Sequence, residues 1–145
     1  MLEELYQEII LDHYRRPRNR GKADPCDRLA KDNNPLCGDE LEVSATIRDG
    51  TVADIKFDGH GCSISQASAS IMTQKLLGKP LSEIGPFIEN FLSMMRGDKP
   101  FGGREMGELK ALEGVLKFPV RVKCATLAWN TARKALTTPP ANGTS

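Results

Sequence analysis

The chain has 145 residues, of which 39% are hydrophobic and 27% are charged, and its net charge is +1. These values are ordinary for a folded globular protein, and so small a charge gives no general attraction to nucleic acid or to anionic membranes. No apolar stretch approaches the roughly 18–20 residues that a membrane-spanning helix needs, and the acidic N-terminal stretch MLEELYQEII does not resemble a secretory signal. We therefore expect a cytoplasmic protein whose four cysteines stay reduced, which favours metal binding or redox chemistry.

The spacing of apolar residues predicts helices in both halves of the chain and strands between them. In chain order we expect a helix over 2–14, a weaker strand over 27–33, a hairpin over 41–59, and helices over 65–77, 81–95, 108–114 and 120–136. The dipeptide Asp49-Gly50 is a strong signal for the turn of the hairpin. The last two long helices each carry apolar residues that are predicted to face the core. They are Ile84, Phe87, Ile88, Phe91 and Leu92 in the helix over 81–95, and Ala125, Trp129, Ala132 and Leu136 in the helix over 120–136.

This order of elements predicts an α+β fold. A small three-stranded antiparallel sheet would carry helices on one face, with a helix at the N-terminus and a long helix at the C-terminus. We expect one domain over residues 1–136 and a disordered tail over 137–145.

Three of the four cysteines stand where one predicted element gives way to the next. Cys37 precedes the hairpin, Cys62 follows it, and Cys124 is placed at the start of the last helix. Element ends from distant parts of a chain can converge, and with Asp39 the three thiols would complete a four-ligand site. Zinc takes thiolate sulfur and carboxylate oxygen, usually in a tetrahedron.

Local sequence supports such a convergence. Cys37 and Asp39 are two residues apart, so both can point to one side of an extended segment, and Gly38 between them permits a turn. Gly59 and Gly61 give the same freedom around the second cysteine, and a helix N-terminus near the third would favour its thiolate. Without a CxxC pair, spacing alone leaves open that each cysteine is simply a small buried residue.

Four motifs resemble those of the U-type iron–sulfur cluster assembly proteins, the IscU/SufU family, over about residues 3–136. In order they are LDHYRRPRNRG, NPLCGD, GHGCSISQASAS and VRVKCATLAW. The resemblance implies that Cys37, Asp39, Cys62 and Cys124 are metal ligands around one site at an end of the sheet.

Two features resemble the SufU branch of this family. Lys123 occupies the position of a histidine in scaffold-type members, and the segment around 87–107 is longer than theirs. The resemblance implies a tightly bound zinc and a cysteine desulfurase, a pyridoxal-phosphate enzyme, as the sulfur donor. The predicted function is a zinc-dependent sulfur acceptor, a sulfurtransferase partner with no free-standing turnover.

Two other functions stay open at this point. One is a scaffold that assembles and hands on a labile iron–sulfur cluster, and the other is a zinc-stabilised binding module without transfer chemistry. Downstream iron–sulfur assembly proteins are further expected partners, whereas nucleic acid and membranes are not.

The sequence also predicts which cysteine accepts the sulfur and which nearby residues are not ligands. Cys37 is the expected sulfur acceptor because Gly38 can act as a pivot, and Cys124 is the second choice. His60 is expected to be exposed beside the site, and Cys26 to be a bystander thiol.

Residues that are not candidate ligands are expected to have docking or structural roles. The arginines of the basic segment 15–20 are expected to form either a solvated helix end or, as the family resemblance implies, a docking surface for an acidic partner. His13 is expected to pack or hydrogen-bond at its helix end, and Trp129 to lie in the core.

Overall fold

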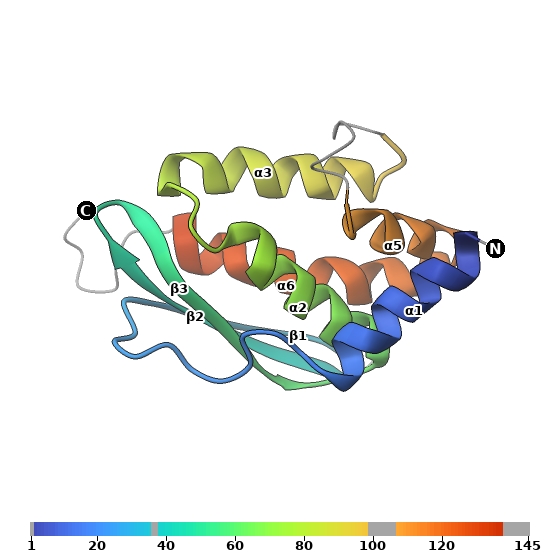
Figure 1. Cartoon of the computed structure of the whole chain (residues 1–145), viewed down its shortest axis with the longest axis horizontal. Helices are drawn as coiled ribbons and strands as arrows, with labels where there is room; N and C mark the ends of the chain where they lie inside the picture. The colour runs from blue at the N-terminus through green and yellow to red at the C-terminus, as the bar shows by residue number, and fades with distance from the viewer. Residues whose placement is uncertain (1, 36–37, 99–106, 138–145) are drawn as a thin grey trace.

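The structure is a computed structural model that describes residues 2–35, 38–98 and 107–137, with side chains of the first helix described from Gln7 onward (Figure 1). Cys37, most of the expected glycine-rich loop before residue 107, and the expected tail after residue 137 lie outside the described residues.

Every predicted helix and strand is present, and its ends differ from the prediction by at most two residues. The elements are α1 (Leu2–Arg15), β1 (Arg28–Asn34), β2 (Asp39–Arg48), β3 (Thr51–His60), α2 (Ser63–Leu76), α3 (Leu81–Met94), α5 (Leu109–Glu113), the 3₁₀ helix η1 (Gly114–Lys117) and α6 (Pro119–Thr137). Within the described ranges, no helix is both long and apolar enough to cross a membrane.

The three strands form one antiparallel sheet in the order β1-β2-β3. The turn between β2 and β3 has positive φ angles at Asp49 (54°) and Gly50 (72°), as a two-residue hairpin turn requires. The pairing shifts register between Thr46 and Ile47, and this irregularity lets Val52 and Ile55 both lie buried in the core although they are three residues apart.

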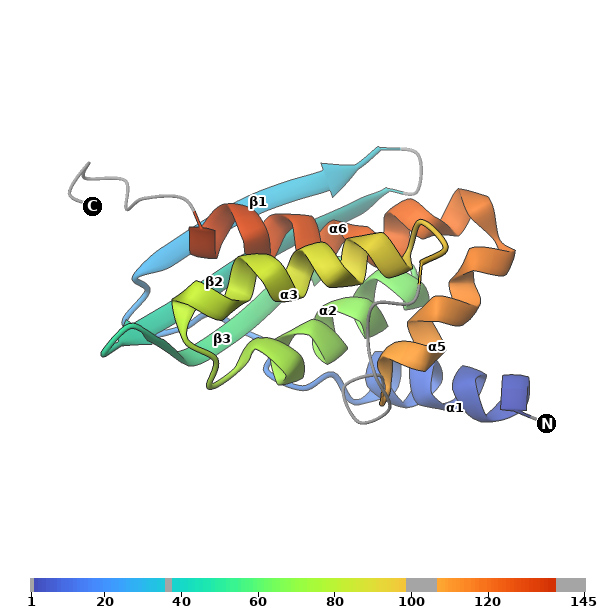
Figure 2. The same ribbon diagram turned by 90° about the horizontal axis from the view of Figure 1, so that it is seen from above.

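All the helices lie on one side of the sheet, which confirms the predicted α+β arrangement (Figures 1 and 2). Helix α6 packs against β1 and β2, and α2 packs against β3. Helix α3 packs on α6, on the side away from the sheet, while α1 and α5 lie together beside α2 at one end of the molecule.

The predicted core residues of α3 and α6 are all buried. Trp129 is at their contact, with its ring stacked on Phe91 at a centroid distance of 3.9 Å. Its indole N–H donates to the Ser68 hydroxyl of α2 at 3.0 Å, so the only polar atom of this large side chain is satisfied inside the core. The prediction that Trp129 is a core residue is confirmed.

The outer face of the sheet is covered near the hairpin turn by the segment between α1 and β1. The Ala23 amide donates to the Ser44 hydroxyl at 2.9 Å, and the Thr46 hydroxyl donates to the Pro25 carbonyl at 2.6 Å. At the other end of the sheet, where β2 begins and β3 ends, Glu40 and His60 stay exposed.

Candidate metal centre

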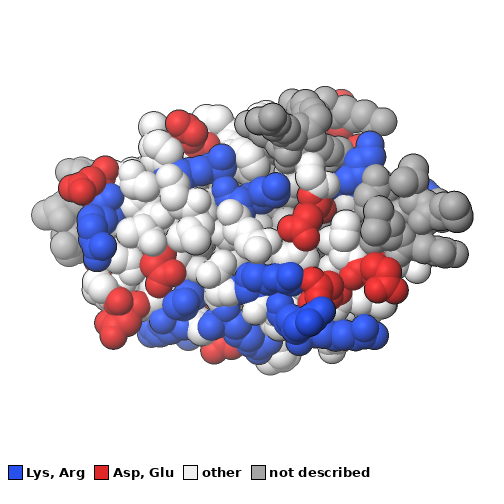
Figure 3. All heavy atoms as spheres, viewed as in Figure 1, with Lys and Arg blue, Asp and Glu red and all other residues white. Residues whose placement is uncertain are grey.

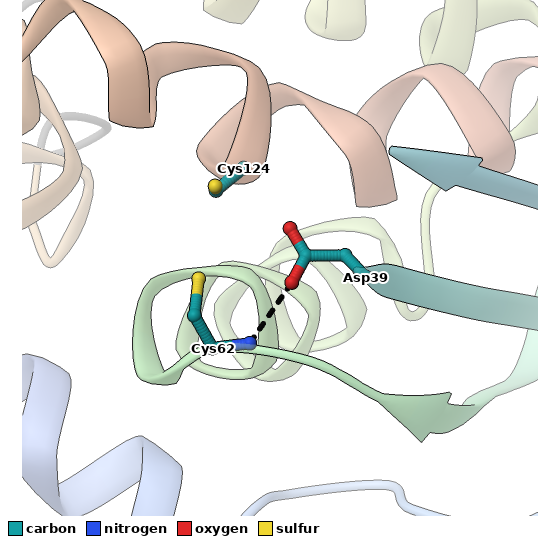
Figure 4. A group of neighbouring side chains, drawn as sticks. All are labelled: Asp39, Cys62 and Cys124. Carbon is teal, nitrogen blue, oxygen red and sulfur yellow. Dashed lines mark hydrogen bonds between the residues drawn. The ribbon is translucent and has the colours of Figure 1, made fainter. Parts of the chain in front are cut away.

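Three of the four predicted ligands converge at the open end of the sheet. One possible ligand atom from each of Asp39, Cys62 and Cys124 lies within 4.8 Å of the others (Figure 4). They come from the start of β2, from the residue before α2, and from α6. Cys37, the fourth predicted ligand, lies outside the described residues.

The carboxylate of Asp39 is fully buried, and among the described residues only one of its two oxygens has a hydrogen-bond partner. Its Oδ1 accepts a hydrogen bond from the backbone amide of Cys62 at 2.9 Å. Its Oδ2 is buried without a hydrogen-bond partner among the described residues, and in Figure 4 this oxygen points toward Cys124. An unsatisfied buried acceptor costs about 1–3 kcal/mol, so a ligand that takes up Oδ2 would recover this energy.

Cys62 caps the N-terminus of α2 and is partly exposed. Its backbone is extended, with φ −70° and ψ 168°, and its side chain makes no capping hydrogen bond. The thiol therefore lies next to the partial positive charge of a fourteen-residue helix, which stabilises anions at that end.

Cys124 is deeper in its helix than the sequence predicts. Helix α6 begins at Pro119, in agreement with the preference of proline for the first helical position, so Cys124 lies in the second turn. The prediction of a helix N-terminus beside this thiol is therefore wrong, because the helix N-terminus at the site is that of α2, at Cys62. Cys124 is buried, and the Asn34 side-chain amide donates to its sulfur at 3.9 Å.

The glycines around the site serve different purposes. Gly38 has φ 71° and Gly59 has φ 127°, values that side chains disfavour, so both confirm the predicted backbone freedom. Gly61 has no such φ, but a side-chain carbon there would fall on the carboxylate oxygen Oδ1 of Asp39 and the hydroxyl of Ser65. Space, rather than backbone conformation, requires glycine at position 61.

The donor set fits a zinc ion. Two thiolates at about 2.3 Å from a tetrahedral zinc are roughly 3.8 Å apart, so atoms within 4.8 Å of one another need to approach by only about 1 Å. Two sulfurs and a carboxylate oxygen are ligands that zinc accepts. The unsatisfied Oδ2 of Asp39 could supply the oxygen.

His60 and Cys26 lie outside this cluster, as predicted. The His60 imidazole is exposed and pairs with Glu40 at 3.1 Å across the outer face of the sheet. Cys26 is exposed, and its sulfur lies 3.4 Å from the Arg28 carbonyl oxygen.

A second buried polar cluster centres on His13, whose predicted hydrogen bonding is confirmed. One ring nitrogen lies 2.7 Å from the Ser70 hydroxyl and the other 2.8 Å from the Glu108 carboxylate. Although this order of groups resembles a catalytic triad, Ser70 is fully buried and accepts the Arg18 amide at 2.9 Å. The cluster therefore ties α1 to α2 and to the start of α5.

Sequence reasoning missed two residues that contact the candidate ligands. Ser65 lies 3.2 Å from Asp39 Oδ1, and Asn34 reaches the sulfur of Cys124. Both stand within the quoted motifs or directly beside them, but serine and asparagine are so common near turns and helix starts that their identity alone gives no signal.

Comparison with known proteins gives consistent matches. The chain matches the family model for the NifU-like N terminal domain over residues 5–125. It is 43% identical over 136 residues to the zinc-dependent sulfurtransferase SufU of Bacillus subtilis, covering 93% of this chain and 91% of that protein. It is 38% identical to the iron–sulfur cluster assembly scaffold protein IscU of Streptococcus pyogenes, covering 93% and 84%. A solved structure of a hypothetical protein has TM-score 0.85 and 38% identity, covering 93% and 98%.

Proposed function

The chain belongs to the family of NifU-like N-terminal domains, and on this premise we propose that it is a zinc-binding sulfur acceptor for a cysteine desulfurase in iron–sulfur cluster assembly. The observation that carries the proposal is the convergence of Asp39, Cys62 and Cys124, with one carboxylate oxygen left unsatisfied. The similarity to a zinc-dependent sulfurtransferase over 93% of the chain supports it.

In this proposal the metal is held by Cys37, Asp39, Cys62 and Cys124. A bound zinc stabilises thiolates at neutral pH and protects them from oxidation. Because Asp39 begins β2, Cys62 precedes α2 and Cys124 is in α6, the same ion would join three elements that are distant in sequence.

Sulfur transfer itself is a thiolate exchange. The desulfurase carries a persulfide on its own cysteine, and a thiolate of this chain attacks the outer sulfur. A new sulfur–sulfur bond forms on this chain, the bond within the partner's persulfide breaks, and the partner's cysteine leaves as a thiolate. No external oxidant or reductant is consumed.

We propose Cys37 as the thiol that accepts the sulfur. Cys124, the second choice, is fully buried in α6, so an outside persulfide could reach it only after that helix moved. Gly38, next to Cys37, is exposed and has a left-handed backbone, which supports a loop able to change conformation when a partner docks.

A basic edge beside this site provides a surface for the partner. Figure 3 shows Lys and Arg side chains gathered along one edge of the molecule, where in Figure 1 the segment after α1 runs. Arg15, at the end of α1, and Arg16 and Arg20, in that segment, are exposed. The Arg20 side chain also donates a hydrogen bond at 2.7 Å to the carbonyl of Gly59, which is three residues before Cys62 in the chain. Complementary charge raises association rates, so we propose an acidic docking surface on the desulfurase.

The proposal is tested by incubating the zinc-loaded protein with a cysteine desulfurase and cysteine. Alanine formation should rise and persulfide should appear on this chain by mass spectrometry. Cys37→Ser should abolish both effects, whereas Cys26→Ser, the matched control at an exposed thiol outside the site, should leave them intact. Equal activity of the two variants would reject Cys37 as the acceptor.

A second candidate function is a scaffold for a labile two-iron cluster. The 38% identity to a protein named as a scaffold favours it, and three thiolates with one carboxylate can hold such a cluster. Adding iron to the same reaction separates the two functions through the visible spectrum. A cluster spectrum that persists longer in Asp39→Ala, without stimulated alanine formation, would replace the acceptor function with the scaffold.

A further inference from the structure

The carboxylate of Asp39 is held through one oxygen only. Oδ1 accepts the Cys62 amide at 2.9 Å and lies 3.2 Å from the hydroxyl oxygen of Ser65. Oδ2 has no hydrogen-bond partner within the described part of the chain. A carboxylate can offer a metal either one oxygen or both, so groups that occupy Oδ1 decide which oxygen remains for the ion.

The hydroxyl of Ser65 is placed to take part in this choice. Ser65 is in the first turn of α2, is fully buried, and also lies 3.0 Å from the Cys62 carbonyl oxygen. A hydroxyl has one proton to donate, and a hydrogen bond to a carboxylate is stronger than one to a neutral carbonyl. The proton of Ser65 therefore goes to Asp39.

These two groups occupy the space where a side chain at position 61 would lie. A side-chain carbon at position 61 would overlap both Asp39 Oδ1 and the Ser65 hydroxyl. The missing side chain of Gly61 thus leaves the space in which the Asp39 carboxylate and the Ser65 hydroxyl meet. With Oδ1 fixed, Oδ2 keeps the direction shown in Figure 4, toward Cys124.

We propose that Ser65 is the positioning residue of Asp39. Its hydroxyl holds Oδ1, so that the carboxylate offers a metal the single oxygen Oδ2 in a fixed direction. This inference rests on the metal site of the proposed function and extends it to a side chain outside the four proposed ligands. Removing a group that orients a metal ligand typically lowers metal affinity by about 10- to 100-fold.

The test compares two serines of the same helix. Ser65→Ala removes the hydroxyl beside Asp39, and Ser70→Ala removes an equally buried hydroxyl that contacts His13 instead. Zinc affinity is measured by competition with a chromophoric chelator, and the ligand geometry by the visible absorption of the cobalt-substituted protein. Ser65→Thr, which keeps the hydroxyl, serves as the rescue variant.

We expect Ser65→Ala to bind zinc about 10- to 100-fold more weakly and to change the cobalt spectrum, while Ser70→Ala and Ser65→Thr keep the wild-type spectrum. Wild-type affinity and spectrum in Ser65→Ala would overturn the inference, and so would an equal loss of affinity in Ser70→Ala. Failure of the wild-type protein to bind zinc is a different result, because it would reject the metal site and the proposed function themselves.

Discussion

Two clusters of buried polar side chains lie at different places in this molecule, and they differ in how fully their hydrogen bonds are satisfied. Around His13, both ring nitrogens have partners, and the Ser70 hydroxyl also accepts a backbone amide. Around Asp39, one carboxylate oxygen has two neighbouring donors and the other has no hydrogen-bond partner in the part of the chain described.

The difference separates a structural cluster from a candidate binding site. Buried polar groups in native proteins are nearly always paired, because leaving one unpaired costs about 1–3 kcal/mol. The His13 cluster recovers that energy by joining α1 to its neighbours. The Asp39 cluster leaves part of it unrecovered, beside two thiols, at the open end of the sheet. The contrast predicts that metal and mutations affect the two clusters differently.

Removal of zinc should have the largest effect on the stability of the protein. At a free zinc concentration about 1,000 times Kd, binding to the folded state alone adds about 4 kcal/mol of stability, which corresponds to roughly 10 °C in melting temperature for a domain of this size. Calorimetry of the zinc-loaded protein with and without a chelator measures the change. A chelator that removes the zinc and leaves the melting temperature unchanged would show that the Asp39 cluster does not couple to folding.

Asp39→Asn should weaken zinc binding but should not lower the stability of the metal-free protein. Loss of the carboxylate ligand should weaken zinc binding about a hundredfold, or about 2.7 kcal/mol. Without metal, the variant should be as stable as the wild type or up to about 1 kcal/mol more stable, because burying an amide costs less than burying a charge. Chelator competition and urea unfolding give the two values. A large loss of metal-free stability would mean that the carboxylate is structural.

His13→Ala should instead lower the stability of the metal-free protein and leave zinc binding unchanged. It removes one buried and one partly buried hydrogen bond, and we expect the free energy of unfolding to fall by about 2–3 kcal/mol, with zinc affinity unchanged. Urea unfolding of the metal-free protein and chelator competition again provide the measurements. Tenfold weaker zinc binding in this variant would show that the two clusters are coupled and that the comparison fails.

The smallest effect on the free energy of unfolding should come from the pair of Asp32 and Lys134, which joins β1 to α6. The hydrogen bond from the Lys134 ammonium, at 2.7 Å, lowers the pKa of the Asp32 carboxyl below its ordinary value of 3.8. A lowered folded-state pKa stabilises the protein above pH 3.8, and this contribution is lost as the pH falls through the lower folded value. The pair is largely exposed, so we expect less than about 1 kcal/mol.

Asp32→Asn tests this prediction in metal-free protein. The variant should be slightly less stable than the wild type at pH 7, and the difference should shrink as the pH falls below 3.8 and also in 1 M salt, where exposed charges are screened. Urea unfolding at pH 7 and at pH 3 measures it. A difference that grows at low pH would contradict the assignment.

Sequence alone determined the helices, the strands and the faces that they bury, because these depend on local and periodic features, whereas the candidate ligands came from the resemblance to the family motifs. Residues spaced as in a helix had to share a face, which placed Phe91 and Trp129 in the core. The Asp49-Gly50 turn fixed the hairpin, and cysteines at element ends marked the site. Asp39, Cys62 and Cys124 could therefore be proposed before any distance was known, but only the family motifs favoured them over the alternative that each cysteine is a small buried residue.

Only the tertiary structure decided how the site is supported and which parts of it are accessible. Ser65 meets Asp39, and Asn34 meets Cys124, across gaps of 26 and 90 residues in the chain. Such contacts depend on how α2, α6 and the sheet pack together, and no local pattern encodes that packing. For the same reason, the helix N-terminus at the site belongs to Cys62, while Cys124 is buried one turn further along its own helix.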